Sequence, residues 1–138
     1  MIVGFTGTRD GLDYRQRFRL RQLLYEELEV AEAHHGNCLG GDSVFAELVY
    51  PRFRTVAHPC NIPGLQLTRT TAHVYLPVKP PLDRNRDIVD ACDILVACPK
   101  GPEERRSGTW ATIRYARKAG KPIRLVWPDG TVVEEEGR

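Results

Sequence analysis

ILVACPKGPEERRSGTWATIRYARKA, residues 94–119, contains an apolar run, a charged loop and a segment of helix-forming composition, in that order. This order predicts a buried strand, a loop and a helix whose first turn contains Ser107-Gly108-Thr109-Trp110. Backbone N–H groups at such a helix start have no partner within the helix and favour an anion. Ser107 is expected to cap the helix or to offer its hydroxyl to a ligand, and Trp110 is either a core residue or a stacking surface.

The same pattern occurs three times earlier in the chain. Residues 2–6 (IVGFT) precede Gly7-Thr8-Arg9, residues 37–39 (NCL) precede Gly40-Gly41-Asp42-Ser43, and residues 55–58 (TVAH) precede a loop that contains Asn61. Strands that alternate with helices predict an α/β fold with a mostly parallel sheet and right-handed crossovers. All loops that follow strands then lie at one edge of this sheet, where ligands bind at the point of strand-order reversal.

The remaining segments complete this prediction. Asp13 is expected to cap a helix over 13–33, with Tyr14 and Phe18 on its apolar stripe and His34 and His35 at its end. A short helix is expected over 83–91, with Arg84 in its first turn, where a cation opposes the helix dipole and therefore indicates a ligand or an acid nearby. We expect an irregular insertion at 65–81, where prolines disfavour a helix, a last strand at 123–127, and a frayed acidic tail at 131–138.

The composition predicts a single domain over residues 1–138. The net charge of +2 is too small to indicate a nucleic-acid-binding protein, although basic residues gather in the last third of the chain. The four cysteines form no C-x-x-C pair and no zinc-ligand pattern, so buried free thiols in a reducing compartment are expected, without a metal. No run approaches the roughly 20 apolar residues of a membrane span, and the first apolar run is too short for a signal peptide, so we expect a cytoplasmic protein.

The loops together predict a binding site for a small ligand that carries a phosphate. The spacing G-x-G-x-x-G of dinucleotide-binding folds does not occur, so ordinary NAD binding is not expected and no cofactor is predicted. The candidate ligand-binding residues lie in four strand-following loops and one helix start, and they are Gly7, Thr8, Arg9, Gly40, Gly41, Asp42, Ser43, Asn61, Arg84, Ser107, Gly108, Thr109 and Trp110.

Four motifs resemble the SLOG superfamily of Rossmann-like proteins. They are GFTGTRDG at 4–11, HGNCLGGDSVFAEL at 35–48, RNRDIVDACDILVACP at 84–99 and SGTWATIRYARKAGKPI at 107–123. The superfamily includes the Lonely Guy phosphoribohydrolases, the DprA-type DNA-processing proteins and small proteins of the YspA or DUF2493 type, which are most similar in length and pattern. The resemblance covers nearly the whole chain except 65–81 and the tail, and it implies a Rossmann-like three-layer sandwich that often forms homodimers.

The resemblance also implies a nucleotide or an ADP-ribose-like ligand, with phosphate at residues 107–109 and further contacts at 40–42 and 7–9. Lonely Guy enzymes carry P-G-G-x-G-T-x-x-E here, and this chain has Thr112 in place of the catalytic Glu. A hydroxyl cannot replace a carboxylate in glycosidic hydrolysis. A sensor or sequestering module is therefore the first hypothesis. The second is an N-glycosidase whose carboxylate comes from Asp10, Asp42, Glu103 or Glu104, and the third is DprA-like binding of single-stranded DNA.

Overall fold

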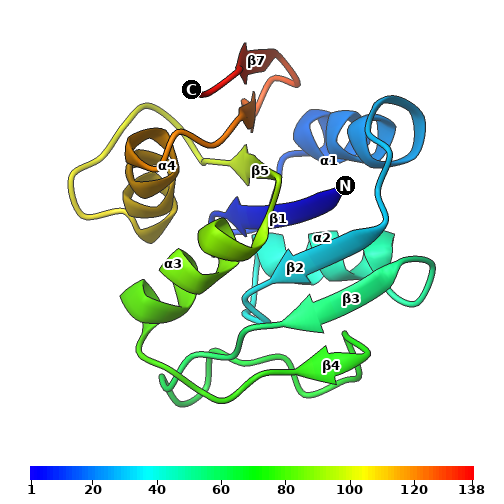
Figure 1. The fold of residues 1–138 in the computed structure, drawn as a ribbon, viewed down its shortest axis with the longest axis vertical. Coiled ribbons are helices and arrows are strands. Elements are labelled where there is room, and N and C mark those ends of the chain that lie inside the picture. Colours follow the sequence, from blue (N-terminus) through cyan, green and yellow to red (C-terminus); the bar gives the residue numbers. More distant parts are fainter.

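The computed structural model describes residues 1–138, and its centre is one seven-stranded sheet with the order β4-β3-β2-β1-β5-β6-β7. The strands are β1 (Ile2–Gly7), β2 (Glu32–His35), β3 (Arg54–Ala57), β4 (Val74–Tyr75), β5 (Ile94–Cys98), β6 (Ile123–Val126) and β7 (Val132–Glu135). Strands β1 to β6 are parallel, and only β7 runs antiparallel to its neighbour. The predicted α/β fold with a mostly parallel sheet is confirmed (Figure 1).

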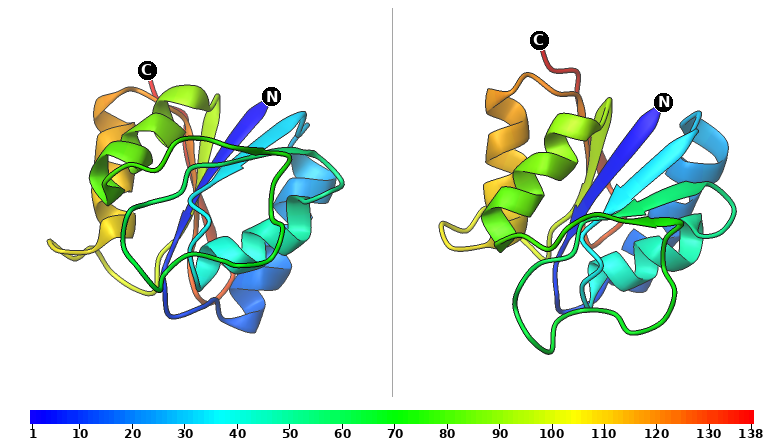
Figure 2. Two further views of the ribbon diagram at one scale, coloured as in Figure 1. Left: turned by 90° about the horizontal axis from the view of Figure 1, so that it is seen from below. Right: turned by 60° about the horizontal axis from the view of Figure 1, so that its bottom comes forward.

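Four α-helices cover the two faces of the sheet (Figure 2). They are α1 (Tyr14–Gln22), α2 (Gly41–Val49), α3 (Pro81–Ala91) and α4 (Gly108–Lys118), and α1 continues into a π-helical turn, η1 (Leu23–Glu27). One core cluster joins Leu20 and Leu24 to Phe45 of α2, whereas the other joins Val89 of α3 to Ile113 of α4. The three-layer arrangement therefore encloses two cores, one on each face of the sheet.

The chain changes direction beside β1. From β1 it moves outward through β2, β3 and β4, and it then returns to form β5 on the other side of β1. The loops that follow β1 and β5 consequently diverge at one edge of the sheet. This is the strand-order reversal at which α/β proteins bind ligands.

The predicted helix over 13–33 is too long. Helical structure ends at Glu27, Leu28 has extended dihedral angles, and the next strand is Glu32–His35 rather than 37–39. His34 and His35 thus lie inside β2 and are buried, not at a helix end. Burial of Ala33 in the core and pairing of this segment with β1 and β3 outweigh the helix propensity of its Glu and Ala residues.

The apolar stripe predicted for α1 is also partly wrong. The side chains of Tyr14 and Phe18 are 76% and 62% exposed, and the helix instead buries Gln16 and Leu20. The amide of Gln16 donates hydrogen bonds to the carbonyl oxygens of Pro99 at 2.9 Å and Val126 at 2.8 Å. A polar residue lies on the buried stripe because it satisfies two carbonyls at the ends of β5 and β6.

Three further boundaries differ from the sequence prediction. Helix α3 begins at Pro81 rather than Asp83, since the first helical position does not need a backbone N–H. The insertion at 65–81 contains the short strand β4 but is otherwise irregular. The tail is not frayed over Val132–Glu135, because β7 pairs with β6 and Glu135 forms an ion pair with Arg117 at 2.8 Å.

The predicted helix caps and the predicted free cysteines are confirmed. Asp13 caps α1 by accepting from the N–H of Arg15, and Ser107 caps α4 by accepting from the N–H of Trp110. All four cysteines are buried and free. None of the helices is long and apolar enough to pass through a bilayer.

Candidate functional site

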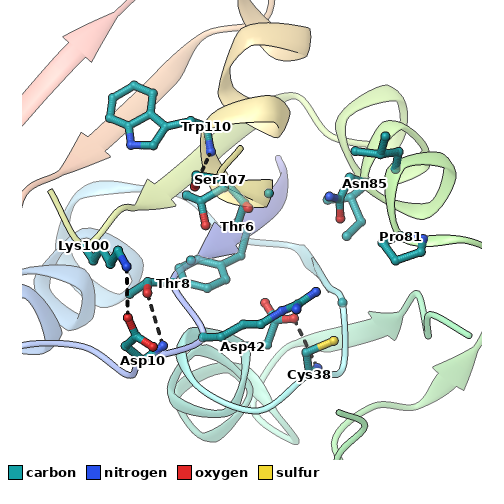
Figure 3. Close-up of a pocket in the computed structure, with 18 of the residues that line it drawn as sticks. Thr6, Thr8, Asp10, Cys38, Asp42, Pro81, Asn85, Lys100, Ser107 and Trp110 are labelled. Atoms are coloured by element: carbon teal, nitrogen blue, oxygen red, sulfur yellow. Dashed lines mark hydrogen bonds and ion pairs between the residues drawn. The ribbon is translucent and has the colours of Figure 1, made fainter. Parts of the chain in front are cut away.

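A cavity of about 430 Å³ opens at the carboxyl edge of the sheet, where the loops after β1 and β5 diverge. Its walls come from the loops after β1, β2 and β5 and from the first turns of α2, α3 and α4 (Figure 3). Volumes of this size are typical of small-molecule sites. The topology thus brings together loops that are distant in the sequence.

The N-terminus of α4 is the part of the cavity best suited to an anion. Gly108 and Thr109 line the cavity, and their N–H groups lie in the first turn, where the helix offers no acceptor. The first turns of α2 and α3 contain Asp42 and Asp83, whereas α4 has no acidic residue there. Of the three helices that begin at the cavity, only α4 therefore has a positive dipole end that no carboxylate in its first turn compensates.

Cationic side chains surround the mouth of the cavity. Arg9, Lys100 and Arg106 are exposed and line it, together with the carboxylates of Asp10 and Glu104. Lys100 Nζ lies 3.4 Å from Asp10 Oδ2. Both ions of this pair are more than half exposed, so the pair is weak and leaves Lys100 able to reach a ligand.

Two loops on one side of the cavity pack backbone against backbone. The N–H of Gly41 donates to the carbonyl of Thr8 at 2.8 Å. Gly40 has φ of +89°, and a Cβ there would collide with the backbone of Arg9. Gly40 and Gly41 are therefore required for this packing. Neither lines the cavity, and their contact with a ligand stays a prediction.

Arg84 lies at the base of the cavity and is only 6% exposed. Its Nη1 donates to the carbonyl oxygens of Gly36 at 2.5 Å and His58 at 2.9 Å, and its Nε donates to Asn85 Oδ1 at 2.6 Å. The guanidinium is thus committed to protein groups and ties α3 to the loops after β2 and β3.

Asp42 is the acid that accompanies Arg84. Its Oδ2 accepts from the N–H of Cys38 at 3.2 Å. Burial raises the pKa of the Asp42 carboxyl, and nearby His35 and Arg84 oppose this shift. Asp42 consequently holds the loop after β2 in place and also lines the cavity.

The loop after β5 is held at several points. Pro99 is fixed by Gln16, and Gly101 accepts from Trp110 Nε1 at 3.2 Å. Arg114 donates to the carbonyl oxygens of Glu104 at 3.3 Å and Arg105 at 3.1 Å. The Trp110 ring packs against Trp127 and is almost fully buried, so Trp110 is primarily a core residue.

Most of the predicted ligand-binding residues line the cavity. Those that do are Gly7, Thr8, Arg9, Asp42, Arg84, Ser107, Gly108, Thr109 and Trp110. Ser43 and Asn61 do not: the hydroxyl of Ser43 accepts from Arg69 at 2.8 Å, and Asn61 lies in the loop after β3. Sequence reasoning missed Leu39, Leu82 and Asn85, because a single leucine or asparagine carries no distinctive pattern.

The candidate catalytic carboxylates do not all line the cavity. Asp10, Asp42 and Glu104 line the cavity, whereas Glu103 does not and forms an ion pair with Arg114 at 2.9 Å. Thr112 is buried, and its hydroxyl donates to the carbonyl of Gly108 at 2.9 Å. The position that corresponds to the Lonely Guy glutamate therefore presents no side chain to the cavity.

A chain of three titratable groups, of which the two histidines are buried, connects β2 to the residue that follows β3. His34 Nε2 is 2.7 Å from Glu32 Oε2, and His34 Nδ1 is 2.7 Å from His58 Nε2. In the neutral pair, His34 donates to Glu32 and accepts from His58. Burial and nearby His34 lower the pKa of His58 to about 4. Arg84 and Asp87 of α3 also act on His58, as does His35 of β2.

We expect the free energy of unfolding to decrease as the pH falls from about 6.5 toward 4. The unfolded chain binds a proton at His58 first, so stability present above pH 6.5 is lost in this interval, by about 3 kcal/mol for His58 alone. Urea unfolding at several pH values measures the slope. The variant His58→Gln should flatten it, and an unchanged slope would contradict the assignment to this residue.

Comparisons with known proteins agree on the fold. Neither family models nor curated proteins match the sequence. A molybdenum cofactor binding protein from Rippkaea orientalis is 18% identical with a TM-score of 0.70, and the match covers 91% of this chain and 76% of that one. DNA processing protein A from Helicobacter pylori is 21% identical with a TM-score of 0.64, covering 91% and 64% of the two chains. The structural-genomics target TM1055 is 17% identical with a TM-score of 0.62, covering 88% and 71%.

These likenesses confirm the Rossmann-like fold that the resemblance to the SLOG superfamily implies. The chain spans 64% of the DNA-processing protein, which binds single-stranded DNA. At 17–21% identity the likenesses show the fold alone. The finer resemblance to YspA-type proteins stays a prediction.

Proposed function

We propose that this protein binds a nucleotide or a nucleotide-derived ligand of the ADP-ribose type, and that it acts as a sensor or sequestering module. The observation that carries the proposal is the start of α4, which opens into the cavity without an acid in its first turn. A phosphate group there would accept from the N–H groups of Gly108 and Thr109. One structurally similar protein is named a cofactor-binding protein, which supports binding of a small molecule.

The rest of the cavity suits the remainder of a nucleotide. Arg9, Lys100 and Arg106 at the mouth can neutralise a second phosphate. Leu39 and Leu82 offer exposed apolar side chains to a base or a ribose face. A single site thus provides anion recognition and apolar contact for one elongated ligand.

Binding without turnover is favoured because the hydroxyl of Thr112 is buried and bonded to Gly108. The second candidate function is hydrolysis of an N-glycosidic bond in a nucleoside monophosphate. It is favoured by the carboxylates of Asp10, Asp42 and Glu104, which line the same cavity. One of them would stabilise an oxocarbenium-like centre or activate water.

Native mass spectrometry with AMP, ADP-ribose, NAD and cyclic nucleotides tests both candidates. We expect an intact nucleotide to be retained, and at about 100 times its Kd it should stabilise the protein by roughly 2.7 kcal/mol, which raises Tm by roughly 10 °C. The same spectrum reports whether the protein is the homodimer that the resemblance implies.

Two other results would redirect the proposal. Retained ribose phosphate with free base in solution would establish the glycosidase. Failure of every nucleotide to bind, together with a salt-dependent affinity for an oligonucleotide, would favour the DprA-like alternative instead.

A further inference from the structure

Two of the four thiols lie next to each other at the base of the cavity. Cys38 Sγ, in the loop after β2, is 3.8 Å from Cys60 Sγ, in the loop after β3. Cys92 and Cys98 belong to the segment around β5, where the Cys92 thiol donates to the carbonyl of Val89. The chain therefore contains one pair of adjacent thiols and two separate thiols that are packed in the protein core.

The pair has one route to solvent. Cys38 lines the cavity, as Figure 3 shows, whereas Cys60 is completely buried. A small reagent that enters the cavity would reach Cys38 first, and Cys60 is the only other thiol in contact with it. This is the arrangement of an attacking thiol with a resolving thiol behind it.

Arg84 gives Cys38 a charged neighbour. Its Nη2 donates to Cys38 Sγ at 3.4 Å, which favours the thiolate. Burial nevertheless raises the pKa of the Cys38 thiol above its ordinary value, and this outweighs the effect of Arg84. Oxidation should therefore be slow at neutral pH and should become faster as the pH rises.

We propose that Cys38 and Cys60 form a redox-active dithiol that opens onto the ligand cavity and closes to an intramolecular disulfide when a peroxide enters. The Cys38 thiolate attacks one peroxide oxygen, the O–O bond breaks, and Cys38 becomes a sulfenic acid. Cys60 sulfur then displaces the hydroxyl as water and forms the S–S bond. The two thiols lose two electrons in total, and hydrogen peroxide is reduced to two molecules of water.

The disulfide would change the base of the cavity. An S–S bond is about 2.05 Å long, so the two sulfur atoms must approach from 3.8 Å. Cys38 Sγ, which accepts from Nη2 of Arg84 at 3.4 Å, must therefore shift relative to this guanidinium. A ligand in the cavity would cover Cys38, and this part of the inference rests on the proposed function.

Thiol counting tests the dithiol without any ligand. After treatment with hydrogen peroxide, the denatured protein should contain two free thiols instead of four, and peptide mapping should find residues 38 and 60 in one linked species. Cys38→Ser and Cys60→Ser should each abolish this species. Cys92→Ser, the matched control, should still form it. Four remaining thiols, a linkage between other cysteines, or oxidation to sulfinic acid without the linked species would overturn the proposal.

A second measurement tests the dithiol proposal and the ligand proposal independently of each other. ADP-ribose at ten times its Kd should slow the oxidation roughly tenfold, because only the free protein reacts. If ADP-ribose neither raises Tm nor slows oxidation while the linked species forms, the dithiol is supported and the proposed ligand is wrong. If ADP-ribose raises Tm but leaves the rate unchanged, access through the cavity is overturned.

Discussion

Gly108→Val is expected to lower the affinity for a phosphate-bearing nucleotide at least about 100-fold, while Tm of the free protein stays within about 2 °C of the wild type. A Cβ at position 108 would meet no atom within 4 Å, and the backbone dihedral angle φ is not in the left-handed region. The valine side chain therefore fits the fold. It would occupy the space over the first N–H groups of α4, where the phosphate is proposed to lie.

Isothermal titration with the nucleotide that native mass spectrometry identifies measures this change. Gly101→Val is the matched control, because a Cβ at Gly101 also meets no atom and this residue does not line the cavity. The control should bind as tightly as the wild type. If Gly108→Val and the control bound the nucleotide equally well, the phosphate would not bind at the start of α4.

Arg84→Met is expected to lower the free energy of unfolding by about 4 kcal/mol. The methionine keeps much of the side-chain volume but donates no hydrogen bonds, so the carbonyl oxygens of Gly36 and His58 lose their buried donor. The carboxyl of Asp42 also loses the cation that opposes its raised pKa.

Urea unfolding measures the loss, and Arg86→Met is the matched control on the same helix. Arg86 is exposed and lies over the ring of Tyr115, so its replacement should change stability by at most about 0.5 kcal/mol. If the two variants were equally stable, the hydrogen bonds of Arg84 would not be important for the fold.

The sequence predicted the elements whose signals are local. Strands β1, β3, β5 and β6 are short runs rich in apolar and β-branched residues that end at or close to a glycine or proline. Ser107 and Asp13 are ordinary caps. Strand β2 was misplaced because EAHH has no strand pattern of its own. Its position depends on distant partners, since His34 contacts His58 and His35 contacts the carbonyl of Thr71.

The candidate site was predicted as a set of loops, because a parallel sheet places every strand-following loop at one edge. The role of each residue within those loops could not be predicted. The glycine pair at 40–41 suggested phosphate contact, but its use is the close approach of two backbones at Arg9. The position of Arg84 predicted a ligand or an acid nearby, and Asp42 is such an acid. The carbonyl oxygens that accept from Arg84 could not be predicted, because they come together only in three dimensions.

The loop after β5 is held in place by hydrogen bonds from Gln16, Trp110 and Arg114, all of which are groups of the protein itself. A preorganised rim loses little conformational entropy on association, and more of the contact energy therefore remains as affinity. This side of the cavity would keep the same shape for all related ligands. We expect the dissociation rates of these ligands to differ much more than their association rates.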